Sequence, residues 1–129
     1  MQQKEYLEEI SGKLEKKYTG FVEIYRLTKE LDDLLKNNDR DSVNMVMKMR
    51  GEEMDKISVI DEDINRACSL ISAQYRKYIN NYNDFDSFPE DLEHIISIKK
   101  RNRRVLEKII EIDKKISVRL AGNKSFYGI

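Results

Sequence analysis

Apolar residues recur at steps of three and four along three stretches of the chain, residues 2–36, 42–81 and 88–121. This spacing places side chains on one face of an α-helix, so each stretch predicts one long amphipathic helix. Asparagine and aspartate concentrate in residues 37–39 and 80–88, where they favour turns. Because short connections make successive helices antiparallel, the pattern predicts an all-α fold. We expect a long antiparallel helical hairpin with a third helix packed along it, forming an elongated three-helix bundle.

The three predicted helices cover almost the whole chain, and its 129 residues are enough for one ordinary domain. We therefore expect a single helical domain over residues 1–122 and a short C-terminal tail over residues 123–129. Capping signals at the starts of the second and third helices support these boundaries. They are Asp39 or Asp41 before the second helix, and Ser87 with Glu90, which match an S-x-x-E capping box, before the third.

Four polar residues stand where the apolar pattern expects a hydrophobic side chain. They are Arg50 in the second predicted helix and Lys99, Asn102 and Asp113 in the third. A polar residue in a helical seam commonly specifies register at some cost in stability. The third helix has the least regular stripe, so we expect it to pack less firmly than the first two.

Composition agrees with long helices that have solvated faces. Charged residues make up 37% of the chain, and glycine and proline contribute only five residues and one residue. Residues 1–20 alternate charged with apolar groups, which is unlike a signal peptide. No apolar run reaches the roughly 20 residues of a membrane span, so we expect a cytoplasmic protein. The single cysteine, Cys68, lies between Ile64 and Ile71 on the apolar face, where a buried, inert thiol is expected.

Charge is unevenly distributed along the chain, although the formal net charge is zero. Residues 83–98 contain five acidic and no basic groups, whereas residues 99–129 contain ten basic and three acidic groups. The run from Lys99 to Arg104 is the most basic segment. No aromatic residues interleave with it as stacking platforms for bases, so we do not expect nucleic acid as a partner. Pairing with acidic surface, in this chain or on a partner, accounts for it better.

Motifs for metal or covalent chemistry are weak. His94 has the acidic neighbours Glu90, Asp91 and Glu93, but one helical turn supplies two ligands at most, so we expect no bound metal. No serine or cysteine stands in an activating motif, and no glycine-rich loop is suited to phosphate. We expect no cofactor.

One short segment resembles an enzyme motif. Residues 60–64 (IDEDI) resemble part of the first-helix pattern of the all-helical chorismate mutases. In that register the two arginines that hold the dicarboxylate substrate would fall on Met54 and Ile71, and the first acidic position would fall on Ser58. Helical periodicity explains the likeness, and we predict that the protein is not an enzyme.

A second resemblance extends over most of the chain. Residues 34–43 (LLKNNDRDSV) followed by residues 49–57 (MRGEEMDKI) resemble the helical-hairpin turn of flagellar type III export chaperones. Residues 100–106 (KRNRRVL) resemble the basic third helix of the FlgN type, and residues 110–116 (IEIDKKI) resemble the late helix of the FliT type. Ser125 to Gly128 (SFYG) is similar to the end of the FlgN helical core. FlgN proteins continue into a flexible segment that engages substrate, whereas this chain ends at Ile129.

The resemblance implies a chaperone that binds an amphipathic helix of a protein client and keeps it soluble before export. The client would be a hook-associated protein for the FlgN type and the filament cap protein for the FliT type. The alternative is a coiled-coil structural or adaptor protein that acts through helix–helix interaction. An exposed apolar groove in the monomer favours the chaperone, and a stripe buried in a homodimer favours the adaptor.

The irregular third helix suggests where a client would bind. Its apolar residues and those of the tail would be accessible to a partner helix, while the first two helices form the scaffold. These candidate client-binding residues are Leu106, Ile109, Ile110, Ile116, Phe126 and Tyr127. Four methionines at positions 45, 47, 49 and 54 fit an adaptable binding surface, although they also suit ordinary core or surface positions.

Overall fold

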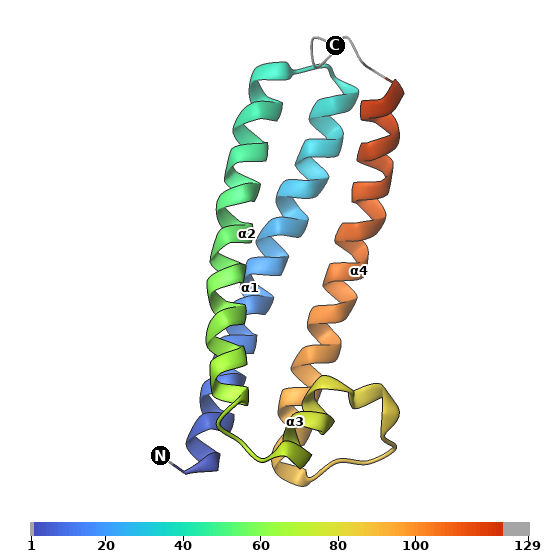
Figure 1. The fold of residues 1–129 in the computed structure, drawn as a ribbon. Helices are drawn as coiled ribbons and strands as arrows, with labels where there is room; N and C mark the ends of the chain where they lie inside the picture. Colours follow the sequence, from blue (N-terminus) through green and yellow to red (C-terminus); the bar gives the residue numbers. More distant parts are fainter. Residues whose placement is uncertain (1, 123–129) are drawn as a thin grey trace. The chain divides into compact units, whose positions relative to one another are not determined.

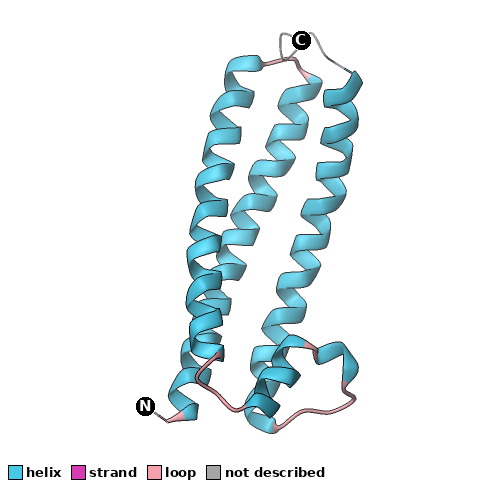
Figure 2. Cartoon of the chain, viewed as in Figure 1, coloured by secondary structure: helices cyan, strands magenta, loops and turns pink. Residues whose placement is uncertain are grey.

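A computed structural model describes residues 2–122 and confirms the predicted all-α class. This part of the chain contains helices and no strand (Figures 1 and 2). The candidate client residues Phe126 and Tyr127 lie outside the described residues. The α-helices are α1 (Gln3–Lys36), α2 (Arg40–Cys68), α3 (Ala73–Asn80) and α4 (Glu93–Gly122), and the short 3-10 helices are η1 (Tyr82–Asp84) and η2 (Glu90–Leu92).

The chain divides into two compact units, and each contains a part of α1, of α2 and of α4. Among the described residues, unit 1 is formed by residues 2–19 and 57–103, and it contains α3 and both 3-10 helices. Unit 2 is formed by residues 20–56 and 104–122. The expectation of a single cooperative domain over residues 1–122 stays a prediction.

Unit 1 packs its helices around an apolar core. The first half of α1 runs antiparallel to the end of α2, since Lys13 bonds Asp63 while Gln3, further back on α1, bonds Ser72. The stripe predicted for α1 is buried here as expected. The buried members of the core are Leu7, Ile10, Leu14, Ala67, Cys68, Ile71, Ile79, Leu92, Ile95, Ile96 and Ile98.

The second predicted helix, residues 42–81, is wrong as a single element, because α2 ends at Cys68 and α3 begins at Ala73. Two serines and an arginine hydrogen-bond the backbone where α2 ends and α3 begins. The Ser69 hydroxyl donates to the Arg66 carbonyl at 2.6 Å, and the Ser72 hydroxyl accepts from the Tyr75 amide as an N-cap. Arg76 donates to two carbonyls of the break. Side chains therefore satisfy backbone groups that the interrupted helix leaves open.

The connection from α3 to α4 is held by aromatic contacts within unit 1. The Tyr78 ring lies 4.6 Å from the Phe85 ring and 5.9 Å from the Phe88 ring, measured between centroids. The predicted capping box does not form, and α4 begins at Glu93 after the 3-10 turn η2. The reason is that Pro89, with ψ 143°, is extended and serves as the N-cap of η2 without a side-chain bond.

Unit 2 packs α1, α2 and α4 around a smaller apolar core. Its buried members are Leu27, Leu31, Leu35, Val43, Val46 and Ile116. Thr28 is also buried, and its hydroxyl donates to the Ile24 carbonyl at 2.6 Å, which satisfies the polar group within the helix.

The turn between α1 and α2 forms as the sequence predicts. Asn38 adopts a left-handed conformation with φ 55°, which asparagine tolerates at a helix C-terminus. The Asp39 amide donates to the Leu34 carbonyl, and the Asp39 carboxylate accepts from the Ser42 amide at 3.2 Å. Asp39 is therefore the N-cap that the sequence left open between two aspartates.

Candidate functional site

The predicted client residues of α4 do not form an exposed surface. Ile109 and Ile116 are 3% and 5% exposed, Leu106 is half-buried, and Ile110 alone is well exposed, at 42%. The expectation that Ile109 and Ile116 are accessible is therefore wrong for this structure. The error lay in treating polar interruptions as loose packing, because the structure gives each interruption a partner.

In unit 2 the polar exceptions of two helices pair with each other. Arg50 of α2 donates through Nη2 to both carboxylate oxygens of Asp113 on α4, each at 2.7 Å. The Arg50 side chain is 16% exposed and the Asp113 side chain 37%. The Arg50 Nε is buried without a hydrogen-bond partner. Two charged residues in facing apolar stripes were the signal that the sequence offered, and pairing them would have predicted this contact.

In unit 1 the polar exceptions of α4 bond backbone carbonyls. The Lys99 Nζ donates to the Ile79 carbonyl at 2.9 Å, and the Asn102 amide donates to the Leu14 carbonyl at 3.2 Å. Asn102 is 5% exposed, and its Oδ1 has no hydrogen-bond partner. Both residues connect α4 to a neighbouring element, so the irregular stripe stabilises specific packing in this unit.

The basic run is divided between the interior and the surface. Arg101 donates to Glu15 at 2.6 Å and lies 3.7 Å from the centre of the Tyr18 ring. With Lys99 and Asn102 also turned inward, only Lys100, Arg103 and Arg104 are exposed. Part of the run therefore pairs within the chain, as the charge pattern suggested.

Four methionines of unit 2 lie exposed on a short stretch of α2. Met45 is 60% exposed, Met47 is 44%, and Met49 and Met54 are each 40%. All four lie on α2 within residues 45–54, and we call this stretch the methionine segment. The sequence left their location open, and the structure decides it in favour of the surface.

The methionine segment presents two rows of side chains. Met45 and Met49 are four residues apart and share one face of α2. Met47, Gly51 and Met54 follow one another at steps of four and three and share another face. A Cβ added at Gly51 would meet no atom within 4 Å, so this second row has open space between its two methionines.

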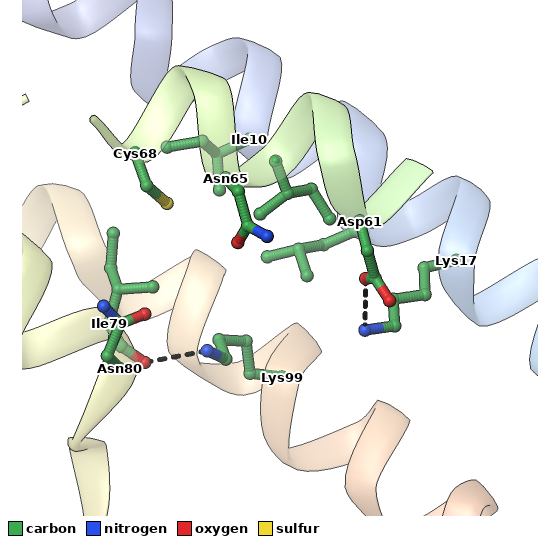
Figure 3. Close-up of a pocket in the computed structure, with 10 residues that line it drawn as sticks. Ile10, Lys17, Asp61, Asn65, Cys68, Ile79, Asn80 and Lys99 are labelled. Carbon is green, nitrogen blue, oxygen red and sulfur yellow. Dashed lines mark hydrogen bonds and ion pairs between the residues drawn. The ribbon is translucent and has the colours of Figure 1, made fainter. Parts of the chain in front are cut away.

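Unit 1 contains a cavity of about 120 Å³ that all four α-helices line (Figure 3). Sequence reasoning did not find it, because the lining residues come from separate helices at unrelated spacings. Ile79 and Asn80 come from α3, a helix that the sequence did not separate from α2. The other lining residues are Ile10, Leu14 and Lys17 from α1, Asp61, Ile64, Asn65 and Cys68 from α2, and Lys99 from α4.

Three charged side chains line this cavity. Lys17 and Asp61 form an ion pair at 2.6 Å, and the Lys99 ammonium lies across from them against the Ile79 carbonyl (Figure 3). Burial lowers the pKa of Lys99, because desolvation penalises its charged form.

The thiol of Cys68 points toward the same cavity (Figure 3). Burial raises the pKa of the Cys68 thiol, so at neutral pH the group is the uncharged thiol. Cys68 is 7% exposed, which confirms the prediction that it is buried.

No group of three or more histidine, cysteine or carboxylate side chains with metal-site geometry occurs within residues 2–122. The His94 side chain is 69% exposed, with its Nε2 3.9 Å from Glu15. Within the same residues, no helix combines the length and apolar content that a membrane crossing requires.

Comparisons of the chain with protein-family models, with curated proteins and with solved structures gave no match.

Proposed function

We propose that this chain binds an amphipathic helix of a protein client on the methionine segment of α2. The observation that carries the proposal is the exposure of four methionines within residues 45–54. Exposed apolar side chains that share one helix face, as those of each methionine row do, are typical of a protein-interaction site, whereas single exposed ones are ordinary. Methionine is unbranched and polarizable, so it adapts to helices of different sequence.

The row formed by Met47, Gly51 and Met54 fits a helical client best. Partner helices anchor through residues spaced three and four apart, and this row repeats the same spacing on the receiving side. The open space above Gly51 lets a client side chain approach the α2 backbone between the two methionines. Ile110 of α4 is also exposed in unit 2.

The particular role that we propose is that of a flagellar type III export chaperone for a hook-associated or filament cap protein. This finer assignment is supported by the sequence resemblance alone. Such a chaperone performs no chemistry, and it needs only a surface that shields the apolar face of a client helix. The exposed methionines of α2 support the proposal, because they are apolar and accessible.

The test is binding of labelled amphipathic peptides from candidate hook-associated and filament cap proteins, followed by fluorescence anisotropy. Replacing Met47 and Met54 together with glutamine keeps side-chain length and removes the apolar surface. Met47 is 44% exposed and Met54 40%, so only that part of each side chain is left for a client to bury. Full burial contributes roughly 1.5–3 kcal/mol per methionine, so we expect the double variant to weaken binding about tenfold or more. Val118→Gln is the matched control, since Val118 is 73% exposed on α4 of the same unit.

The row Met45 and Met49 is tested in the same way by a second double variant. Unchanged binding in both double variants would contradict the proposal. Light scattering of the isolated protein addresses the alternative function. A stable homodimer that protects these methionines from oxidation would instead favour a coiled-coil structural or adaptor protein.

A further inference from the structure

The cavity of unit 1 has the size of a very small organic molecule. Its volume is about 120 Å³. An apolar cavity of about 150 Å³ accommodates benzene, and a water molecule takes about 30 Å³ in the liquid. A ligand that fills the cavity therefore has roughly four to six non-hydrogen atoms.

The charges around the cavity favour a single negative charge on that ligand. Lys17 and Asp61 neutralise each other across 2.6 Å, and Cys68 is uncharged. Lys99 remains as a half-buried ammonium whose hydrogen-bond acceptor is a neutral carbonyl, that of Ile79. Asp61 also acts on Lys99 across the cavity, but two ammonium groups and one carboxylate leave one surplus positive charge. A partly desolvated surplus charge is costly, so a monoanion placed beside Lys99 would be stabilised on entry.

The other residues that line the cavity indicate the chemistry of the uncharged part of the ligand. Ile10, Leu14, Ile64 and Ile79 supply aliphatic surface, which suits a short hydrocarbon chain. An ammonium has three N–H donors, and one of those on Lys99 is used by the Ile79 carbonyl, so another can reach an anion. Asn65 and Asn80 also line the cavity. A doubly charged phosphate would meet only one surplus positive charge and would leave the aliphatic walls without an apolar partner.

We propose that unit 1 binds a short-chain monocarboxylate in this cavity, with its carboxylate beside Lys99 and its hydrocarbon chain against the isoleucine and leucine side chains. The site lies within unit 1 and uses none of the methionine segment, so it is independent of client binding. It gives the protein a small-molecule ligand in addition to a protein partner.

Butyrate is the probe, and isoleucine-methyl NMR of the full chain is the measurement. We expect saturable shifts at Ile10, Ile64 and Ile79, with a dissociation constant on the order of a millimolar for a ligand of this size. Ile24 and Ile112 are in unit 2 and serve as internal controls that should not move. Absence of saturable shifts well above that concentration would overturn the proposal, and so would equal shifts at the control methyls.

Two comparisons test the role of Lys99. Lys99→Met keeps the side-chain stem and removes the charge, and we expect it to weaken butyrate binding at least tenfold. Lys100→Met is the matched control, because Lys100 is the next residue on α4 and is exposed. Equal loss in both variants would overturn the assignment of Lys99.

Butyramide has the shape of butyrate without its charge, and it tests the wild-type protein even if Lys99→Met fails to fold. We expect butyramide to bind at least tenfold more weakly than butyrate. Equal binding of the two compounds would show that the cavity selects shape alone, and the anion site would be rejected.

Discussion

The two units use the same three long helices in different ways. Unit 1 adds α3 and an aromatic-anchored connection, and its inward-facing polar groups surround a cavity. Unit 2 has a smaller core and exposes methionines on its surface. The two polar residues in its apolar stripes, Arg50 and Asp113, form an ion pair with each other. Similar amphipathic helices thus enclose a cavity in one unit and expose methionines in the other, and the difference comes from a few polar and methionine positions.

A substitution in the core of unit 1 should have the largest effect on stability. Ile10 is fully buried, so Ile10→Ala should lower the free energy of unfolding by about 2–5 kcal/mol. Urea denaturation followed by circular dichroism measures the loss. If the chain is one cooperative domain, hydrogen exchange should accelerate in peptides of both units. Acceleration confined to unit 1 would show that the units unfold separately.

The ion pair of unit 2 gives the next largest effect. Asp113→Ala leaves Arg50 half-buried without its partner and should cost about 1–2 kcal/mol, a value kept low because Asp113 is partly exposed. Replacing both residues, with Arg50→Met and Asp113→Leu, should recover most of that loss, since no unpaired charge then remains. A double variant that is less stable than Asp113→Ala would mean that the pair contributes beyond charge compensation.

Helical glycines provide a smaller test in each unit. Gly12 of unit 1 and Gly51 of unit 2 both have open space where a Cβ would lie. Alanine at either position should raise the free energy of unfolding by about 0.5–1 kcal/mol, because it restricts the unfolded chain. The two variants should differ in client binding, which Gly51→Ala should weaken by occupying the space between Met47 and Met54. Equal binding would remove Gly51 from the proposed surface.

Acid titration should give the smallest effect, since it depends on exposed or partly exposed carboxylates. The hydrogen bond from Lys13 lowers the pKa of Asp63 in unit 1. In unit 2 burial raises the pKa of Asp32, but the hydrogen bond and charge of Arg119 outweigh it, so that the pKa of Asp32 is lowered.

Both folded-state pKa values lie below the unfolded value of about 3.9. The stabilisation is therefore present above about pH 4 and is lost as the pH falls through the folded-state values. Urea midpoints measured across that range should fall less steeply for Asp63→Asn and for Asp32→Asn than for wild type. Unchanged slopes in both variants would exclude these pairs as a source of acid sensitivity.

Local patterns were enough to predict most of the helical structure. The stripe of α1, the turn at Asn38 and Asp39 and the burial of Cys68 follow from spacing and side-chain chemistry within a few residues. The break after Cys68 was missed, although Ser69 and Ser72 carried its signal. Apolar periodicity continues across that break, and only the capping bonds distinguish two helices from one.

Long-range packing decided the features on which the two proposals rest. The sequence of one helix does not show whether a polar residue in its apolar stripe has a hydrogen-bond partner, because that partner lies on another helix. Asp113 of α4 is such a partner for Arg50 of α2. Burial of Ile109 and exposure of Met47 depend on how each helix turns about its own axis against its neighbours. The cavity of unit 1 depends on four helices together. Periodicity within a helix specifies which residues share a face, and only the packed neighbours determine which face is covered.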